Sequence, residues 1–120
     1  MKKKILLIED DLALVRSLQK LFTNAGFDID WALDGEEGLA KVSDVCDCIV
    51  LDLALPKKDG WEVLEELKNN DGTKHVPVVI CTVLDGDHYR KRAKDLGADG
   101  YVNKFHDDLL GEVERILGAL

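Results

Sequence analysis

The sequence predicts an α/β fold in which a parallel β-sheet is covered by helices on both faces. The main observation is an alternation: short apolar runs rich in Val, Ile and Leu are each followed by a segment with apolar residues at helical spacing. Continuously apolar runs are typical of strands that are buried on both faces. A chain of 120 residues suits one core and is too short for two. The five predicted strands occupy residues 4–8, 28–32, 48–51, 76–81 and 101–102.

The segments between the strands carry helix signals. Leucines repeat at helical spacing after residue 12, and Gly26 ends this first helix. Asp34 followed by Glu37 forms a capping box at the start of the second helix. The fourth and fifth helices are expected at 85–96 and 107–117. The acids best interpreted as helix caps are Asp34, Asp59, Asp85 and Asp107.

The composition limits the function classes. There are 24 acidic and 16 basic residues, a formal net charge of −8, which argues against binding to nucleic acid or an anionic membrane and leaves room for a cation. The N-terminal MKKKILLI is too short to be a signal peptide or a membrane span, so we expect a cytoplasmic protein. Three cysteines are too few and unsuitably spaced for a disulfide framework, and we interpret them as small core residues rather than zinc ligands: Cys46, Cys48 and Cys81. Trp31 and Trp61 are assigned to packing.

Reactive side chains follow four of the predicted strands. Ligands of open parallel sheets bind at the carboxyl ends of the strands, so these residues are expected on one edge. They are Glu9 and Asp10, then Asp52, Thr82 and Lys104. Clustered carboxylates repel one another or bind a cation, and such hard oxygens suit Mg²⁺. An ionised aspartate can form an aspartyl-phosphate, while a hydroxyl and an ammonium neutralise phosphoryl oxygens.

Four stretches together resemble one protein family. They are ILLIEDD at 5–11, IVLDLALPKKDG at 49–60, VPVVICT at 76–82 and LGADGYVNK at 96–104. In this order and at these spacings they are similar to the receiver domain of two-component response regulators, over essentially the whole chain. The resemblance implies one receiver domain at residues 1–120, with a flavodoxin-like, doubly wound (βα)5 three-layer sandwich and strand order 2-1-3-4-5.

The resemblance also implies a phosphoacceptor and a metal site. Asp52 would take a phosphoryl group from a phosphohistidine on a sensor histidine kinase or histidine phosphotransfer protein. Glu9 and Asp10 would hold Mg²⁺ (or Mn²⁺) together with Asp52 and the backbone carbonyl of Ala54. From the residues alone, Asp11 either caps the first helix or supports the metal.

The remaining family positions imply a switch. Thr82 and Lys104 would contact the phosphoryl group, and Tyr101 would turn inward when Thr82 moves. The face of the fourth helix, fifth strand and fifth helix would then change for a downstream protein target or output domain. Such a domain is a phosphorylated signalling module and no enzyme beyond self-catalysed phosphotransfer and dephosphorylation.

The sequence departs from the family pattern at two places. Val83 stands where a small residue is usual, and its bulk is expected by the phosphorylation site. Phe105 follows Lys104 directly where the family has proline with a cis peptide, in a loop about two residues short, so a trans bond is expected. Glu112 stands where DNA-binding members of the family have an arginine that they use to dimerise through the face of the fourth helix, fifth strand and fifth helix.

Two alternatives remain beside the phosphoacceptor interpretation. One is a degenerate receiver that acts as a phosphorylation-independent interaction scaffold, which Val83 and the altered loop keep open. The other is a haloacid-dehalogenase-type phosphatase, which also uses an aspartyl nucleophile but needs an acid where this chain has Ala54. A nucleotide-binding fold is disfavoured because no G-x-G-x-x-G or P-loop occurs.

Overall fold

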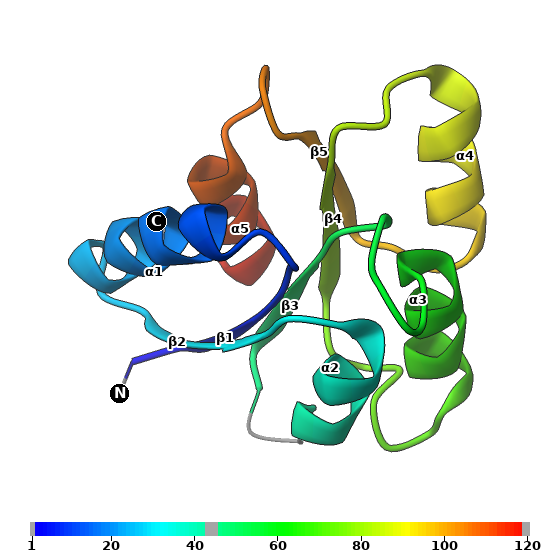
Figure 1. Ribbon diagram of the computed structural model, residues 1–120, viewed down its shortest axis with the longest axis horizontal. Coiled ribbons are helices and arrows are strands. Elements are labelled where there is room, and N and C mark those ends of the chain that lie inside the picture. The colour runs from blue at the N-terminus through cyan, green and yellow to red at the C-terminus, as the bar shows by residue number, and fades with distance from the viewer. Residues whose placement is uncertain (1, 43–45, 119–120) are drawn as a thin grey trace.

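The structure is a computed structural model that describes residues 2–42 and 46–118, in which strands and helices alternate along the chain (Figure 1). The strands are β1 (Lys4–Ile8), β2 (Asp28–Ala32), β3 (Cys48–Leu51), β4 (Val78–Thr82) and β5 (Gly100–Asn103). The helices are α1 (Leu12–Asn24), α2 (Gly35–Lys41), α3 (Gly60–Asn69), α4 (Asp87–Asp95) and α5 (Leu109–Leu117).

The five strands form one parallel sheet in the order β2-β1-β3-β4-β5, which confirms the predicted order. The register places Ile8 of β1 beside Ala32 of β2 on one side and Leu51 of β3 on the other. The residues that follow β1 and β3 therefore emerge next to each other at the carboxyl edge of the sheet.

Helices cover both faces of the sheet, so the predicted three-layer arrangement is confirmed. On one face, α1 and α5 bury Val15, Phe22 and Val113 against alternate strand residues such as Val50. On the other face, α2, α3 and α4 cover a second core cluster that contains Leu64. Figure 1 shows α1 and α5 on the left of the sheet and the other three helices on its right.

Both tryptophans pack against these clusters, as predicted: Trp31 lies at the edge of the α1–α5 cluster and Trp61 at the edge of the other.

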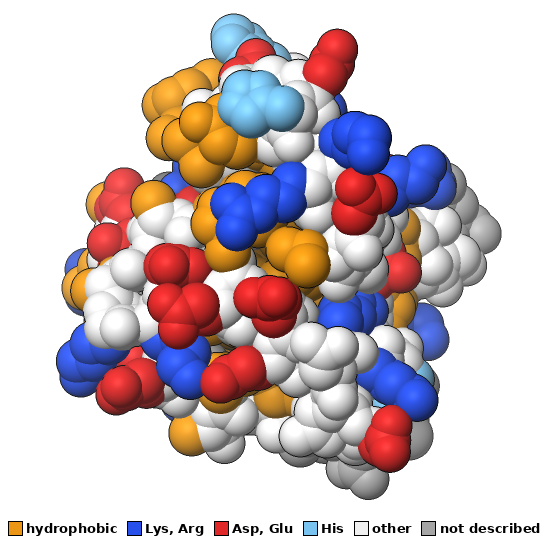
Figure 2. Space-filling view, turned by 90° about the vertical axis from the view of Figure 1, so that its right-hand side faces the viewer, with side chains coloured by type: hydrophobic (Ala, Val, Ile, Leu, Met, Phe, Trp, Pro, Cys, Tyr) orange, Lys and Arg blue, Asp and Glu red, His pale blue; other side chains and the backbone are white. Residues whose placement is uncertain are grey.

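Figure 2 looks onto the α3–α4 side of the molecule, where acidic and basic side chains are interspersed and no large field of one sign forms. Within the described residues, no helix is long and apolar enough to cross a membrane.

Aspartates cap the first three helices. The Asp11 carboxylate accepts hydrogen bonds from the N–H groups of Ala13 and Leu14, so it caps α1. Asp34 and Asp59 cap α2 and α3 through the third residue of each helix, as predicted. Each cap accepts from one or two of the helix N–H groups that lack an intrahelical partner.

The starts of α4 and α5 differ from the prediction. Asp85 does not cap α4: its carboxylate accepts only from the adjacent Gly86 N–H, and Gly86 itself is the N-cap, with φ of 125°. Asp107 does not cap α5 either, because the chain makes a further turn and Asp108 takes that position. An aspartate caps only where the backbone turns its side chain toward the free N–H groups, and a sequence pattern does not contain that turn geometry.

β4 also begins later than predicted, at Val78 rather than residue 76. Pro77 has no N–H to donate to the ladder, although its carbonyl accepts from Ile49 N–H at 2.9 Å. β4 in turn extends to Thr82, whose carbonyl accepts from the backbone N–H of Lys104 at 3.0 Å.

Gly60 allows α3 to start directly against the end of β3. A Cβ at this position would lie 2.2 Å from the carbonyl oxygen of Asp52 and 2.4 Å from the Leu53 Cα. The Gly60 N–H also donates to the Leu53 carbonyl at 2.9 Å. Because Gly60 has no side chain, the start of α3 can approach and hold the backbone that carries Asp52.

We expect Gly60→Ala to lower the free energy of unfolding by about 1–3 kcal/mol, because the new methyl group overlaps backbone atoms that cannot move independently. Gly72→Ala is the matched control, since a Cβ there would meet only the Asn70 side-chain oxygen at 3.2 Å. Urea denaturation of both variants measures the difference. Equal stability of the two would contradict the close approach at Gly60.

Candidate phosphoryl-transfer and metal site

Three carboxylates gather at the carboxyl edge of the sheet. Glu9 and Asp10 follow β1, Asp52 follows β3, and one carboxylate oxygen from each lies within 4.8 Å of the others. The backbone explains this, because Asp52 N–H donates to the Ile8 carbonyl and Glu9 N–H to the Ala32 carbonyl, both at 3.0 Å. The sheet ladder thus continues into the site and holds the acids together.

Lys104 reaches this cluster from the turn that follows β5. Its Nζ lies 2.5 Å from Glu9 Oε1 and 2.9 Å from Asp52 Oδ2. The structure therefore brings together four residues that the sequence predicted for one site, across up to 95 positions of chain: Glu9, Asp10, Asp52 and Lys104.

The site is largely shielded from water. Glu9 is 2% exposed and Asp52 5%, whereas Asp10 is exposed. Burial raises the pKa of Glu9, and hydrogen bonds from Lys104 and Asp11 offset only part of that rise. Burial alone would lower the pKa of Lys104, but the hydrogen bonds to Glu9 and Asp52 outweigh it, and the pKa is raised. Lys104 therefore stays charged and is the positive partner of two buried acids.

The donor set fits a small divalent cation. Three carboxylates face one ammonium, so the cluster carries an excess of negative charge that a cation would balance. The exposed Asp10 leaves the cluster open to solvent, and Mg²⁺ retains several water ligands when it binds carboxylates. Asp11 is committed to the helix cap, so Glu9, Asp10 and Asp52 are the side chains that could hold the ion. In the loop beyond Asp52, the Ala54 N–H donates to Asp52 Oδ1 at 3.3 Å.

Thr82 and Tyr101 are linked through the backbone of Leu84. Thr82 is fully buried at the end of β4, and its hydroxyl accepts from Leu84 N–H at 3.4 Å. The Tyr101 hydroxyl donates to the Leu84 carbonyl at 2.8 Å. A movement of the Thr82 hydroxyl would therefore displace Leu84, whose carbonyl accepts the hydrogen bond from the Tyr101 hydroxyl.

The turn after β5 is built by a residue that sequence reasoning missed. Asn103 is 4% exposed, and its side-chain oxygen accepts from Phe105 N–H at 2.9 Å. The only signal available was the general preference of asparagine for such turns.

The Lys104–Phe105 peptide is trans, as expected, since the described residues contain no cis bond. Phe105 is 77% exposed and Val83 48% exposed on the surface.

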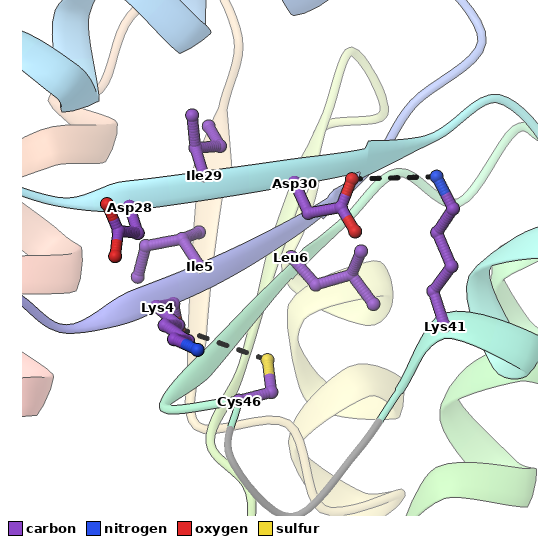
Figure 3. A pocket seen from close by; sticks show the side chains of 8 residues that line it. All are labelled: Lys4, Ile5, Leu6, Asp28, Ile29, Asp30, Lys41 and Cys46. Atoms are coloured by element: carbon purple, nitrogen blue, oxygen red, sulfur yellow. Dashed lines mark hydrogen bonds and ion pairs between the residues drawn. The ribbon is translucent and has the colours of Figure 1, made fainter.

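A separate cavity of about 340 Å³ lies at the opposite ends of the strands, where β1 and β2 begin (Figure 3). Its polar groups are partly paired, because Lys41 Nζ lies 3.5 Å from Asp30 Oδ1. None of the clustered acids lines it, so it is distinct from the acid cluster. Cys46, which lines it, is half-buried, while the two other thiols are core residues, as predicted: Cys48 and Cys81.

Comparison with known proteins places this geometry in a family. Residues 5–113 match the model of the response regulator receiver domain. The transcriptional regulatory protein QseB of Haemophilus influenzae is 43% identical over 118 residues, which cover 98% of this chain and 52% of QseB. Response regulator PleD of Caulobacter vibrioides is 36% identical over 111 residues, 92% of this chain and 24% of PleD. The chain thus spans about half of the length of QseB and about a quarter of the length of PleD.

Solved structures agree. A CheY-like receiver domain protein from Methanospirillum hungatei superimposes with a TM-score of 0.89 at 25% identity, covering 99% of this chain and 96% of that one. A chain of the CheX-CheY-BeF3-Mg²⁺ complex from Borrelia burgdorferi gives a TM-score of 0.88 at 29% identity, over 95% of this chain and 88% of that one. The sequence match, the strand order and the acid cluster facing a lysine agree, and the chain belongs to the response regulator receiver domain family.

Proposed function

We propose that residues 1–120 act as a phosphoacceptor receiver domain, in which Asp52 takes a phosphoryl group from a phosphohistidine on a sensor histidine kinase or histidine phosphotransfer protein. The observation that carries this proposal is the position of Asp52, at the end of β3 with Lys104 Nζ at 2.9 Å and the carboxylates of Glu9 and Asp10 beside it. Burying a carboxylate beside two like charges costs free energy that only a positive partner offsets, and this edge supplies that partner in Lys104.

The transfer is a displacement at phosphorus. A carboxylate oxygen of Asp52 forms the new O–P bond while the N–P bond to the donor imidazole breaks, and the imidazole nitrogen keeps the electron pair and takes up a proton. Lys104 neutralises charge on the phosphoryl oxygens, because its ammonium already contacts Asp52. The Thr82 hydroxyl, which ends the neighbouring strand, would donate to another of these oxygens.

The residues that would hold Mg²⁺ (or Mn²⁺) are Glu9, Asp10 and Asp52, together with the backbone carbonyl of Ala54. When bound, the ion supplies positive charge to the phosphoryl oxygens. Glu9 and Asp10 would thus offset the negative charge of the incoming group indirectly, by retaining the cation. Asp52 stays available as the acceptor.

The signal would leave through Tyr101 and α4. Movement of the Thr82 hydroxyl toward the phosphoryl group would break its contact with Leu84, and Leu84 holds the Tyr101 hydroxyl. The face formed by α4, β5 and α5 would then change for a downstream protein or output domain in the cytoplasm. No other catalysis is proposed beyond self-catalysed phosphotransfer and dephosphorylation.

We expect beryllofluoride with Mg²⁺ to bind the wild-type protein and to shift the NMR resonances of Tyr101, because it mimics a phosphoryl group on Asp52. Asp52→Ala should give no shift, and a small phosphodonor should add one phosphoryl group to the wild type but none to Asp52→Ala, measured by intact mass. Asp71→Asn is the matched control, because the Asp71 side chain is 94% exposed. It should behave as wild type.

Other outcomes would identify the competing functions. A wild-type protein that neither binds beryllofluoride nor accepts a phosphoryl group would contradict the proposal and favour a scaffold that works without phosphorylation. Multiple turnover on a phosphate ester would instead favour a phosphatase of the haloacid dehalogenase type.

We expect Lys104→Met to lower the free energy of unfolding by about 2–3 kcal/mol at pH 7 without divalent cations, because two buried carboxylates lose their positive partner. The pKa of Glu9 is already raised, and losing Lys104 would raise it further. When an acid has a raised pKa in the folded state, the folded protein becomes more stable as the pH falls through that pKa. The loss of unfolding free energy in Lys104→Met should therefore shrink toward pH 4.

Urea denaturation at pH 7 and at lower pH measures this deficit. Lys74→Met is the control, since the Lys74 side chain is 58% exposed and pairs with the exposed Asp71. A deficit that did not depend on pH would assign the loss to packing rather than to charge.

A further inference from the structure

Arg90, on α4, joins three parts of the molecule outside the acid cluster. Its Nη1 donates to the Tyr101 carbonyl at 3.2 Å, and its Nη2 donates to Asp107 Oδ2 at 3.3 Å. The guanidinium carbon lies 4.8 Å from the centre of the Tyr101 ring, and Asp85 Oδ1 is 4.0 Å from Nη2. One side chain thus holds both the switch tyrosine and the turn that follows β5.

Asp107 closes that turn. The same oxygen that accepts from Arg90 accepts from the backbone N–H of Asn103 at 2.9 Å. The Asn103 carbonyl in turn accepts from the N–H groups of His106 and Asp107, at 3.3 and 3.1 Å. The five residues 103–107 therefore form a loop whose two ends are tied to each other, with Arg90 as its external anchor.

Lys104 sits inside this closed loop. Its backbone N–H is fixed by the Thr82 carbonyl, and its side chain extends to Glu9 and Asp52. Because no proline stiffens the turn, its shape depends on hydrogen bonds. The direction of the Lys104 side chain consequently depends on whether Asp107 keeps its place.

We propose that Arg90 is a positioning residue for the phosphorylation site: by holding Asp107, it fixes the turn after β5 and thereby the approach of Lys104 to Asp52. An arginine suits this position because its planar fork donates to two acceptors at once, which a lysine does not reproduce. The proposal deepens the proposed function and rests on it for the role of Lys104.

The arrangement also couples α4 to the site in the opposite direction. A partner that pulled Arg90 away from Asp107 would loosen the Lys104 turn and free the carbonyl of Tyr101. The coupling between the face of α4, β5 and α5 and the phosphorylation site would then run through the guanidinium group of Arg90 as well as through Thr82.

The test uses three variants: Arg90→Gln, Asp107→Asn and the two combined. The control is Lys91→Gln on the same helix, which removes an exposed lysine whose ion-pair partner among the described residues is Asp95. Two quantities are measured in each: the NMR resonance of the Lys104 Cε without ligand, and the apparent affinity for beryllofluoride with Mg²⁺. Asp107→Asn keeps an oxygen for the Asn103 N–H but loses the charge that attracts Arg90.

We expect both single variants to shift the Lys104 resonance and to weaken beryllofluoride binding by roughly two- to fivefold, the range of a partly exposed ion pair. The double variant should be no weaker than either single one, because both remove the same contact. Lys91→Gln should match wild type in both measurements, and Arg90→Lys should recover only part of the affinity.

The proposal is overturned if Arg90→Gln leaves the Lys104 resonance where Lys91→Gln leaves it. It is also overturned if wild type binds beryllofluoride and Arg90→Gln binds it equally well, because the contact would then only secure α4. If wild type itself does not bind, the phosphoacceptor function fails, and the ligand-free Lys104 resonance still decides whether Arg90 positions the lysine.

Discussion

The ammonium group of Lys104 lies between two buried carboxylates at the carboxyl edge of the sheet. Glu9 and Asp52 are held there by continuation of the backbone ladder beyond β1 and β3, so neither can withdraw from the other without breaking sheet hydrogen bonds. Because both side chains are buried, two such acids would be costly without a positive partner. Lys104, directly after β5, is thus the positive partner that offsets these acids, and the arrangement of the strands brings it there.

The surrounding loops keep other groups away from that edge. Asp11 and Asp59 are close to the cluster in sequence, but each is committed to a helix N-terminus. Gly60 lets α3 begin against the carbonyl of Asp52, so the loop after β3 has little room to move. The acids that remain for a cation are few and fixed, which suits an ion that keeps part of its water shell.

The turn after β5 differs from the pattern of the family in a way that has physical consequences. Where a proline would restrict the backbone covalently, this chain uses hydrogen bonds from backbone N–H groups to the side-chain oxygens of Asn103 and Asp107, and Asp107 is held by Arg90. Hydrogen bonds and partly exposed ion pairs are weaker and reversible constraints. The position of the lysine in this protein is therefore tied to the position of α4.

The sequence alone determined the alternation of strands and helices, the residues delivered to the carboxyl edge, and the caps at Asp34 and Asp59, because periodicity and capping act within a few residues. Whether Asp85 or Asp107 caps a helix depended on the path of the backbone, which only the tertiary structure decided. The same holds for the closure of the turn by Asn103 and its anchoring by Arg90. These contacts join side chains to partners on another element, and no local pattern records which partner the fold brings near.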